Sequence, residues 1–170
     1  MKPFLSTEAI KTLVASLVLS RLDYCNSLLT GLQDEKISKL QRAQNCAARL
    51  VLGKSNYHSS MDLLKTLHWL PIKVRVVYKI SLMCFNFFQS YSPDYLNEIF
   101  LEYTPTRVLR FQDSRLLQVP RCNLKRVGER SISYAGPTIW NSLPLSLRFA
   151  DNVAIFKRRL KAYLFDEYLE

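Results

Sequence analysis

Apolar residues repeat at helical spacing in the first part of the chain. Ser6 or Thr7 is suited to cap a helix, and Glu8 stands in the first turn, where the helix dipole favours a negative charge. The apolar stripe that follows consists of Ile10, Leu13, Val14, Leu17 and Val18. The spacing therefore predicts a helix from about Thr7, in a segment that ends at Gly31.

Three more helices are predicted before residue 91. The first of them begins at Asp34 and ends at Gly53, and its apolar stripe consists of Ile37, Leu40, Ala47, Leu50 and Val51. A short helix is expected around residues 60–67. Pro71 suits the first turn of the next helix, which runs to about Ser90 and has a wide apolar face. This breadth predicts that it is the central core helix.

The helical pattern breaks at Thr104. Residues 92–100 still combine a Ser-Pro-Asp start signal with apolar residues at helical spacing. Residues 104–130 have no helical period, and Leu117 and Val119 are the positions that favour a short strand. We therefore expect irregular structure between the fifth predicted helix and residue 131.

Two helices are predicted in the C-terminal part. Residues 131–141 suit a short helix that Gly136 and Pro137 are expected to disturb. Asp151 or Asn152 caps a last, amphipathic helix with Val153, Phe156, Leu160 and Leu164 on its apolar side. The expected fold class is therefore mainly α: a helical bundle with an irregular, basic C-terminal half that has room for one or two short strands. We divide the chain into a helical subdomain, residues 1–103, and a basic subdomain, residues 104–170.

Charge is concentrated in the second half. The chain has 170 residues, 24 Lys and Arg against 14 Asp and Glu, and a formal net charge of +10. Residues 107–161 contain twelve of the bases and three of the acids. Such a balance indicates a polyanionic partner, nucleic acid first and an anionic membrane surface second.

The candidate nucleic-acid-binding residues are bases of this second half. Guanidinium groups spaced through an irregular segment can reach phosphates, since each can donate to two oxygens. The candidates are Arg107, Arg110, Arg115, Arg121, Lys125, Arg126, Arg130, Lys157, Arg158 and Lys161. Nearby aromatic residues could stack unpaired bases: Tyr103, Phe111, Tyr134, Trp140 and Phe149. The alternatives are a solvated basic surface and, for Tyr134 and Trp140, a place in the core.

No residue pattern indicates catalysis. Two-metal nucleotidyl transfer needs converging carboxylates, but the sequence has no Asp-Asp pair and no glycine-rich phosphate loop. The two histidines do not complete zinc-ligand spacing with any cysteine pair, so we expect no metal and no cofactor. Cys25, Cys46 and Cys84 fall in apolar helical segments, which predicts reduced, inert core thiols rather than a nucleophile. We do not expect this chain to be an enzyme.

Several strings, taken in order, resemble one known family. They are Leu19-Ser-Arg-Leu-Asp-Tyr-Cys-Asn-Ser-Leu28, Leu40-Gln-Arg-Ala-Gln-Asn-Cys-Ala-Ala-Arg-Leu50, Leu67-His-Trp-Leu-Pro71, Tyr78-Lys-Ile80, Ser92-Pro-Asp-Tyr-Leu96, Val119-Pro-Arg121, Trp140-Asn-Ser-Leu-Pro144 and Phe156-Lys-Arg-Arg-Leu-Lys161. As a set they resemble the region downstream of the polymerase palm in LINE-type non-LTR retrotransposon reverse transcriptases of the jockey and chicken-repeat type. The resemblance covers nearly the whole chain, although no single string is diagnostic.

The resemblance implies a thumb-like helical part, residues 1–103, followed by the C-terminal domain of an RNA-directed DNA polymerase. The palm with its aromatic-Ala-Asp-Asp motif, the fingers and the endonuclease are absent from the sequence, so no catalytic residue is carried over. Met1 falls just before the first string, which leads us to expect a truncated element and a missing palm as a former partner. Apolar side chains that once faced that palm should then be exposed between Thr7 and Gly53.

Three functional hypotheses remain open from the sequence. The first is a non-catalytic module that binds the phosphate backbone of RNA or DNA. The second is a transposon relic without biochemical activity, and the third is a basic scaffold or membrane-surface module built around the last helix. No apolar run is long enough to span a bilayer. The four cysteines are far apart in sequence and indicate reduced thiols, so we expect an intracellular, nuclear or cytoplasmic protein.

Overall fold

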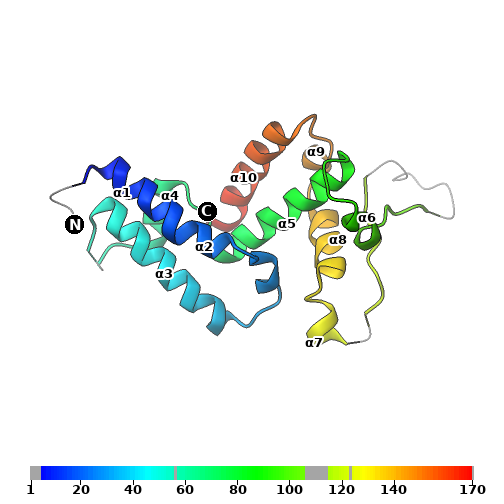
Figure 1. Cartoon of the computed structure of the whole chain (residues 1–170), viewed down its shortest axis with the longest axis horizontal. Helices are drawn as coiled ribbons and strands as arrows, with labels where there is room; N and C mark the ends of the chain where they lie inside the picture. Colours follow the sequence, from blue (N-terminus) through cyan, green and yellow to red (C-terminus); the bar gives the residue numbers. More distant parts are fainter. Residues whose placement is uncertain (1–4, 56, 106–114, 123, 170) are drawn as a thin grey trace.

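The molecule is built from helices, as the apolar periodicity predicts. The computed structural model describes residues 5–55, 57–105, 115–122 and 124–169, without the side chains of Lys125, Arg126 and Leu169. Figure 1 shows a long central helix with the first part of the chain at one end and the third quarter at the other. The expected mainly α fold class is confirmed.

The first predicted helix is interrupted after two turns. It consists of α1 (Thr7–Val14), a π-helical segment η1 (Ala15–Leu19), α2 (Ser20–Asp23) and, after a turn, a 3₁₀ segment η2 (Asn26–Leu29). The side chain of Ser6 accepts a hydrogen bond from the N–H of Ala9 at 3.2 Å, which is the predicted N-cap. Ser16 and Ser20 donate hydrogen bonds to the carbonyls of Leu13 and Ser16, and such bonds bend helices.

Helices α3 (Asp34–Leu52) and α4 (Ser60–Leu67) agree with the sequence expectation. Gly53 ends α3 in the left-handed conformation, with φ of 66°, as a glycine after the last turn does. The buried face of α3 is shifted from the predicted stripe. It includes Gln44 and Ala48, while Leu50 is exposed, because the neighbours of α3 lie on one side of that stripe.

Helix α5 (Ile72–Phe88) is the central core helix, as predicted. Its start is tied to α3 by two glutamines. The Gln41 side-chain carbonyl accepts a hydrogen bond from the Ile72 N–H, and the Gln44 amide donates to the Leu70 carbonyl, both at 2.9 Å. The first N–H groups of a helix have no partner inside it, so Gln41 satisfies one of them from α3.

The segment between α5 and residue 131 is mostly irregular. It contains α6 (Tyr95–Ile99) and a single turn, α7 (Lys125–Gly128), which the sequence did not indicate. The expected strand near Leu117 is reduced to one antiparallel bridge between Glu102 and Leu117. Both backbone groups of Leu117 are instead held by the Asn141 side chain, which accepts at 2.9 Å and donates at 2.8 Å.

The C-terminal part consists of α8 (Ile132–Ser142), α9 (Leu145–Arg148) and α10 (Val153–Leu169). Helix α8 continues through Gly136 and Pro137, where the sequence predicted a disturbance. A Cβ atom on Gly136 would lie 2.5 Å from a ring carbon of Phe100, so glycine allows α8 to approach that ring. The Asn152 side chain caps α10 by accepting from the Ile155 N–H at 2.9 Å.

Two apolar clusters divide the described residues. The small core joins α1, η1, α3 and α4 and ends at Trp69, and the large core begins at Leu70 and joins α5, α6, α8, α9 and α10. The large core therefore contains residues from both sides of the predicted boundary between 103 and 104. That division stays a prediction, and the clusters divide the chain at the connector before α5.

Stacked aromatic rings fill the centre of the large core. The Phe85 and Phe156 rings are nearly parallel, with centroids 4.2 Å apart, and Phe88 stacks on Trp140 at 5.3 Å. Phe85, Phe156 and Trp140 are completely buried. Helices α5, α8 and α10 are therefore held together by rings that each of them contributes.

Phe156→Ala should destabilise the fold strongly. It removes the ring that stacks on Phe85 and leaves a cavity between α5 and α10, which typically costs about 3–5 kcal/mol. Denaturant unfolding followed by circular dichroism measures the free energy. Tyr57→Ala is the control, because that side chain is 99% exposed, and it should change stability by less than about 0.5 kcal/mol. Equal losses in both variants would refute this account of the core.

Candidate nucleic-acid interface

Four of the ten candidate bases lie outside what the structure describes in full. Arg107 and Arg110 fall in residues 106–114, and for Lys125 and Arg126 only the backbone of α7 is described. The remaining six are Arg115, Arg121, Arg130, Lys157, Arg158 and Lys161. Their positions decide how far the basic half of the sequence forms one surface.

Arg115 is used by the fold. Its guanidinium donates to the Arg148 carbonyl at 3.3 Å and lies 5.0 Å from the centre of the Phe149 ring. The Arg115 carbonyl accepts the indole N–H of Trp140 at 2.6 Å. Arg148 is itself buried, and this burial lowers the pKa of its guanidinium. Two arginines of the basic half thus stabilise the contact of the 115–118 segment with α8 and α9.

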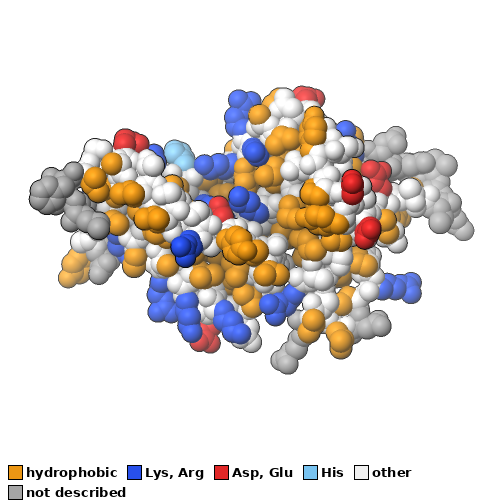
Figure 2. Space-filling view, viewed as in Figure 1, with side chains coloured by type: hydrophobic (Ala, Val, Ile, Leu, Met, Phe, Trp, Pro, Cys, Tyr) orange, Lys and Arg blue, Asp and Glu red, His pale blue; other side chains and the backbone are white. Residues whose placement is uncertain are grey.

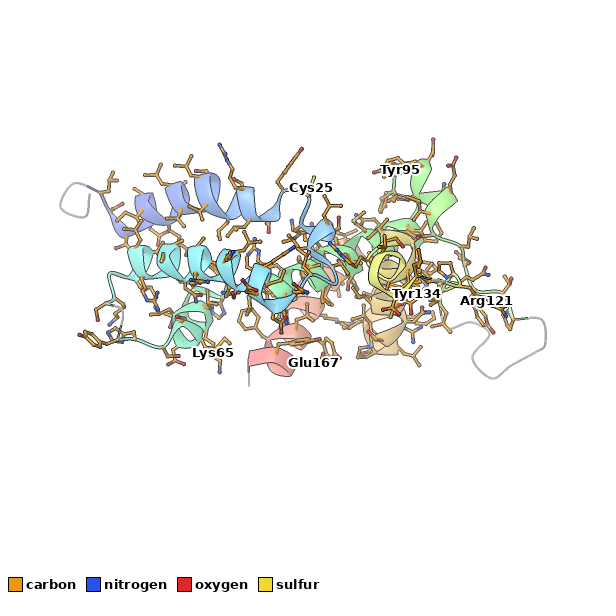
Figure 3. All side chains as sticks on the ribbon, turned by 90° about the horizontal axis from the view of Figure 1, so that it is seen from below. Cys25, Lys65, Tyr95, Arg121, Tyr134 and Glu167 are labelled. Carbon is orange, nitrogen blue, oxygen red and sulfur yellow. The ribbon has the colours of Figure 1, made fainter. Side chains whose placement is uncertain are left out.

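Four candidates are exposed, Arg121, Arg130, Lys157 and Arg158, but they do not form one surface. Arg121 is near the end of the molecule opposite Lys65 (Figure 3). Lys157 and Arg158 lie on α10, across α5 from α7 (Figure 1). The positive charge that is contiguous in sequence is therefore distributed over different faces.

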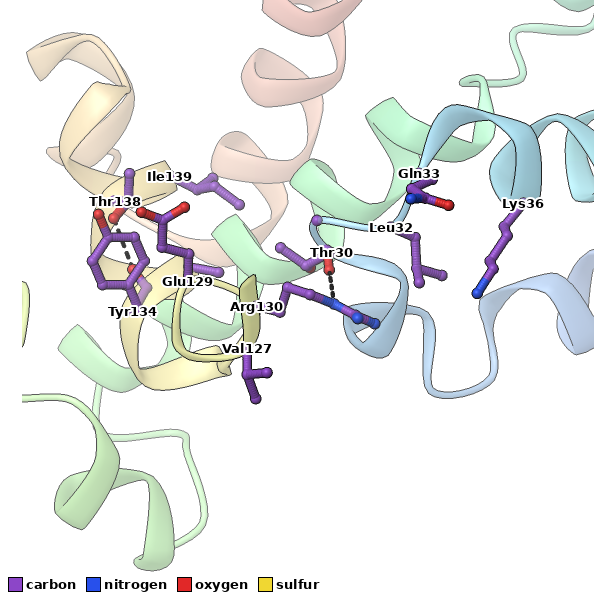
Figure 4. A pocket seen from close by; sticks show the side chains of 12 residues that line it. Thr30, Leu32, Gln33, Lys36, Val127, Glu129, Arg130, Tyr134, Thr138 and Ile139 are labelled. Carbon is purple, nitrogen blue, oxygen red and sulfur yellow. Dashed lines mark hydrogen bonds between the residues drawn. The ribbon is translucent and has the colours of Figure 1, made fainter. Parts of the chain in front are cut away.

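Arg130 lies in a groove of about 740 Å³ between the η2–α3 turn and α8 (Figure 4). Its Nε atom donates to the Thr30 carbonyl at 3.3 Å, and its aliphatic part crosses Gly31. Gly31 has φ of +67°, a conformation that glycine adopts without strain. Among the described residues no carboxylate lies within 4.0 Å of the Arg130 guanidinium.

The opposite wall of the groove adds bases from the first half of the chain. Lys36 lines it, and Lys39 and Arg42 follow at spacings of three on the exposed side of α3. Figure 2 shows Lys and Arg side chains in a row from α3 towards the start of α8. These α3 bases were not among the candidates predicted from the sequence. Their periodicity opposite the apolar stripe of α3 was the available signal.

Carboxylates moderate the charge of this basic edge, defined as Lys36, Lys39, Arg42 and Arg130. Glu129 lines the groove and Glu35 is exposed beside Lys36. Asp34, in the same turn, forms an ion pair with Lys73 on α5. The basic edge thus keeps an excess of positive charge.

The aromatic candidates separate into core and surface. Trp140 is fully buried in the large core, as its alternative interpretation required. Tyr134 is half-buried and lines the groove, while Phe149 is packed under Arg115. Tyr103 is exposed, and Phe111 lies outside the described residues. Tyr134 is therefore the aromatic ring placed beside the basic edge.

A second, smaller pocket of about 240 Å³ forms where α2, α5 and α10 meet. Asp23 accepts two hydrogen bonds from Arg75, at 2.8 and 2.6 Å, and the Lys79 ammonium lies 3.6 Å from the same carboxylate. Lys161 also lines this pocket. Burial lowers the pKa of its ammonium group, and the positive charge of Arg75 lowers it further.

The expectation of three core thiols is correct only for Cys84. Cys84 is buried in the large core, and burial raises the pKa of its thiol well above the ordinary value. Cys46 is exposed on α3, and Cys25 is exposed in a left-handed turn with φ of 49°. Helical position alone did not reveal which side of the helix each thiol occupies.

Metal-binding clusters and membrane-spanning helices are both absent from the residues that the structure describes. No group of three or more His, Cys, Asp or Glu is placed there to hold a metal ion. No helix in the described part of the chain has the length and hydrophobicity needed to cross a membrane.

The chain matches no protein-family model, no curated protein and no solved structure. What the fold and the site define is therefore a class: a mainly α protein with a basic edge beside one groove and a charged pocket between α2, α5 and α10.

Asp23→Asn should destabilise the fold more than Asp34→Asn. The Asp23 and Arg75 side chains are only 22% and 17% exposed, so a neutral amide leaves a largely enclosed guanidinium without its carboxylate. We expect a loss of about 1.5–3 kcal/mol. The Asp34–Lys73 pair is 82% and 59% exposed and should contribute less than about 1 kcal/mol. Denaturant unfolding of both variants tests the difference, and equal effects would contradict it.

Proposed function

We propose that this chain is a non-catalytic nucleic-acid-binding segment related to the C-terminal region of LINE-type reverse transcriptases. In this proposal the basic edge contacts the phosphate backbone of RNA or DNA without reading base sequence. The observation that carries it is the row of exposed bases on α3 that continues to Arg130 across the groove. Tyr134 in the same groove offers a ring on which an unpaired base can stack.

Contacts made by the strings that carry the resemblance support this proposal. Gln41 and Gln44 of the second string hold Leu70 and Ile72 at the third, and Asp23 of the first string binds Arg75. The first three strings therefore have a physical role in joining segments far apart in sequence. Such roles are expected where a set of strings defines one folded region.

An apolar surface supports a second candidate, a segment that packs against another domain such as a polymerase palm. Leu17, Tyr24 and Leu28 are 65%, 81% and 72% exposed, and Leu13 is exposed one turn before Leu17. Figure 2 shows hydrophobic side chains along α1 and α2. Exposed apolar groups gathered on one face are typical of interaction surfaces.

The apolar side of α10, on which the membrane-surface hypothesis depends, is buried inside the protein. Phe156, Leu160 and Leu164 of α10 are buried in the large core, so these side chains are not free to enter a lipid surface. The exposed bases Lys157 and Arg158 remain as an alternative site for a polyanion.

Neutralising α3 should reduce the salt dependence of binding. Wild type is expected to bind labelled RNA and DNA with a dissociation constant of about 10⁻⁴–10⁻⁶ M at physiological salt. Lys36→Gln with Lys39→Gln removes two bases, so the log–log salt slope on duplex DNA should become shallower by about 2. Fluorescence anisotropy between about 50 and 200 mM salt measures the slope.

The matched control is Lys157→Gln with Arg158→Gln, which removes the same charge from α10. It should leave the slope unchanged. If the salt slope changes only in this control variant, the nucleic-acid interface lies on α10 instead of α3. Salt-independent or absent binding of wild type to RNA, single-stranded DNA and duplex DNA would favour the relic without biochemical activity.

Polar substitution of the exposed apolar face should reduce self-association. Leu17→Ser with Leu28→Ser should lower both oligomerisation, seen by sedimentation equilibrium, and the binding of a hydrophobic dye. Leu124→Ser with Leu145→Ser is the control, because both leucines are exposed outside this face. Leu124 precedes α7, and Leu145 is the first residue of α9. If both double variants behave alike, the α1–η2 face is not a special surface.

A further inference from the structure

The small pocket around Asp23 carries more positive charge than its own carboxylate neutralises. Arg75 and Lys79 come from α5, Lys161 comes from α10, and Asp23 is the one acid among the residues that line the pocket. Figure 1 shows α2, α5 and α10 converging near the middle of the molecule. Three cations against one carboxylate leave two positive charges in excess.

Asp23 is already engaged by two of these cations. Both of its oxygens accept hydrogen bonds from Arg75, and the Lys79 ammonium lies 3.6 Å from Oδ2. Within the described residues no carboxylate lies within 4.0 Å of the Lys161 ammonium, whose nearest recorded partner is the Phe165 ring at 5.8 Å. The charge of Lys161 is therefore not balanced by the part of the chain that the structure describes.

The charge of Lys161 is the one that an anion in the pocket would stabilise. Partial burial of Lys161 weakens its hydration, and Arg75 repels it, which is why its pKa is lowered. An anion placed between Arg75, Lys79 and Lys161 would offset the repulsion between Arg75 and Lys161. It would also compensate Lys161 for its weakened hydration. The fold thus holds three cations close together in a setting where their charge is best stabilised by a ligand.

Enough hydrogen-bond donors remain for such a ligand. A guanidinium has five N–H groups, and Arg75 uses two nitrogens for Asp23, which leaves donors on the third. Each lysine ammonium has three N–H groups. The volume of about 240 Å³ is below the lower limit of about 300 Å³ for pockets that take drug-sized ligands. A small, highly charged group suits it better than a large organic molecule.

We infer that this pocket binds one phosphate group that carries close to two negative charges, held by Arg75, Lys79 and Lys161. A phosphate monoester carries about −1.5 to −2 charges at neutral pH, which matches the excess of positive charge. A carboxylate or an internal phosphodiester carries a single negative charge and would leave one cation unbalanced. The group can come from free inorganic phosphate or from the terminal phosphate of a nucleic acid.

The inference does not depend on the proposed nucleic-acid function. The pocket and the groove beside the basic edge share no lining residue. A variant can therefore lose binding in the pocket while the groove stays intact, and the reverse also holds. Variants of the pocket and of α3 keep the two proposals distinguishable.

The first test is thermal unfolding of the full chain in inorganic phosphate and in chloride at equal ionic strength. Phosphate should raise the unfolding midpoint in a concentration-dependent way, because it binds the folded state. Lys161→Gln and Lys79→Gln should each weaken the apparent phosphate affinity about tenfold or more. Lys161→Arg keeps the charge and should retain the effect, and Lys65→Gln on exposed α4 should behave as wild type.

Lys161→Gln without phosphate should unfold at or above the wild-type midpoint, since it removes a charge that burial disfavours. If either glutamine variant fails to fold, the other still provides the comparison. A phosphate effect equal to that of chloride, or one that survives in both glutamine variants, would overturn the inference.

The second test separates the two sources of phosphate. Oligonucleotides with a terminal phosphate and with a terminal hydroxyl compete against inorganic phosphate in the wild type and in Lys161→Gln. A Lys161-dependent preference for the phosphorylated end supports recognition of a nucleic-acid terminus. If inorganic phosphate binds but the oligonucleotides show no such preference, the pocket is a site for the free ion. If neither the phosphorylated oligonucleotide nor inorganic phosphate binds in a Lys161-dependent way, the proposed site is excluded.

Discussion

Burial of α5 is the constraint on which both parts of the molecule depend. Its rings and aliphatic side chains are the shared wall of the large core, against which α8 and α10 pack. Its first N–H is satisfied by Gln41 of α3, which fixes the small core relative to the large one. The charged residues of α5 reach neighbouring elements at its surface: Arg75 and Lys79 pair with Asp23 of α2, and Lys73 pairs with Asp34 of α3. Packing and electrostatics are therefore set by the same helix.

Polar side chains join the segments wherever backbone groups would otherwise be buried without partners. Gln44 satisfies the Leu70 carbonyl, Asn141 satisfies both backbone groups of Leu117, and the Trp140 indole satisfies the Arg115 carbonyl. A buried peptide group without a hydrogen bond costs about 1–3 kcal/mol, so each amide specifies one arrangement of the chain. Several of these residues belong to the strings on which the resemblance to LINE-type reverse transcriptases rests.

Bases that are clustered in the sequence are separated in the folded chain, and bases from distant segments are brought together. Arg115 and Arg148 stabilise the α8–α9 region, while the groove and the small pocket each combine bases from the two halves of the chain. Residues 107–161 hold most of the net charge, yet Arg130 lines the groove while Lys157 lies on α10 and does not line it. The bases that line the groove and the small pocket are thus brought together by tertiary contacts rather than by a contiguous basic segment.

The sequence by itself determined the helices, because amphipathic spacing and caps are local. Asp34–Leu52, Ser60–Leu67, the central role of α5 and the apolar side of α10 were all predictable, as was the burial of Trp140 as one of two alternatives. Only the tertiary structure decided which thiols are exposed, that α8 approaches the Phe100 ring at Gly136, and which cations meet Asp23. These outcomes depend on residues far apart in sequence, such as Phe100 and Gly136 or Asp23 and Lys161, whose proximity no local pattern contains.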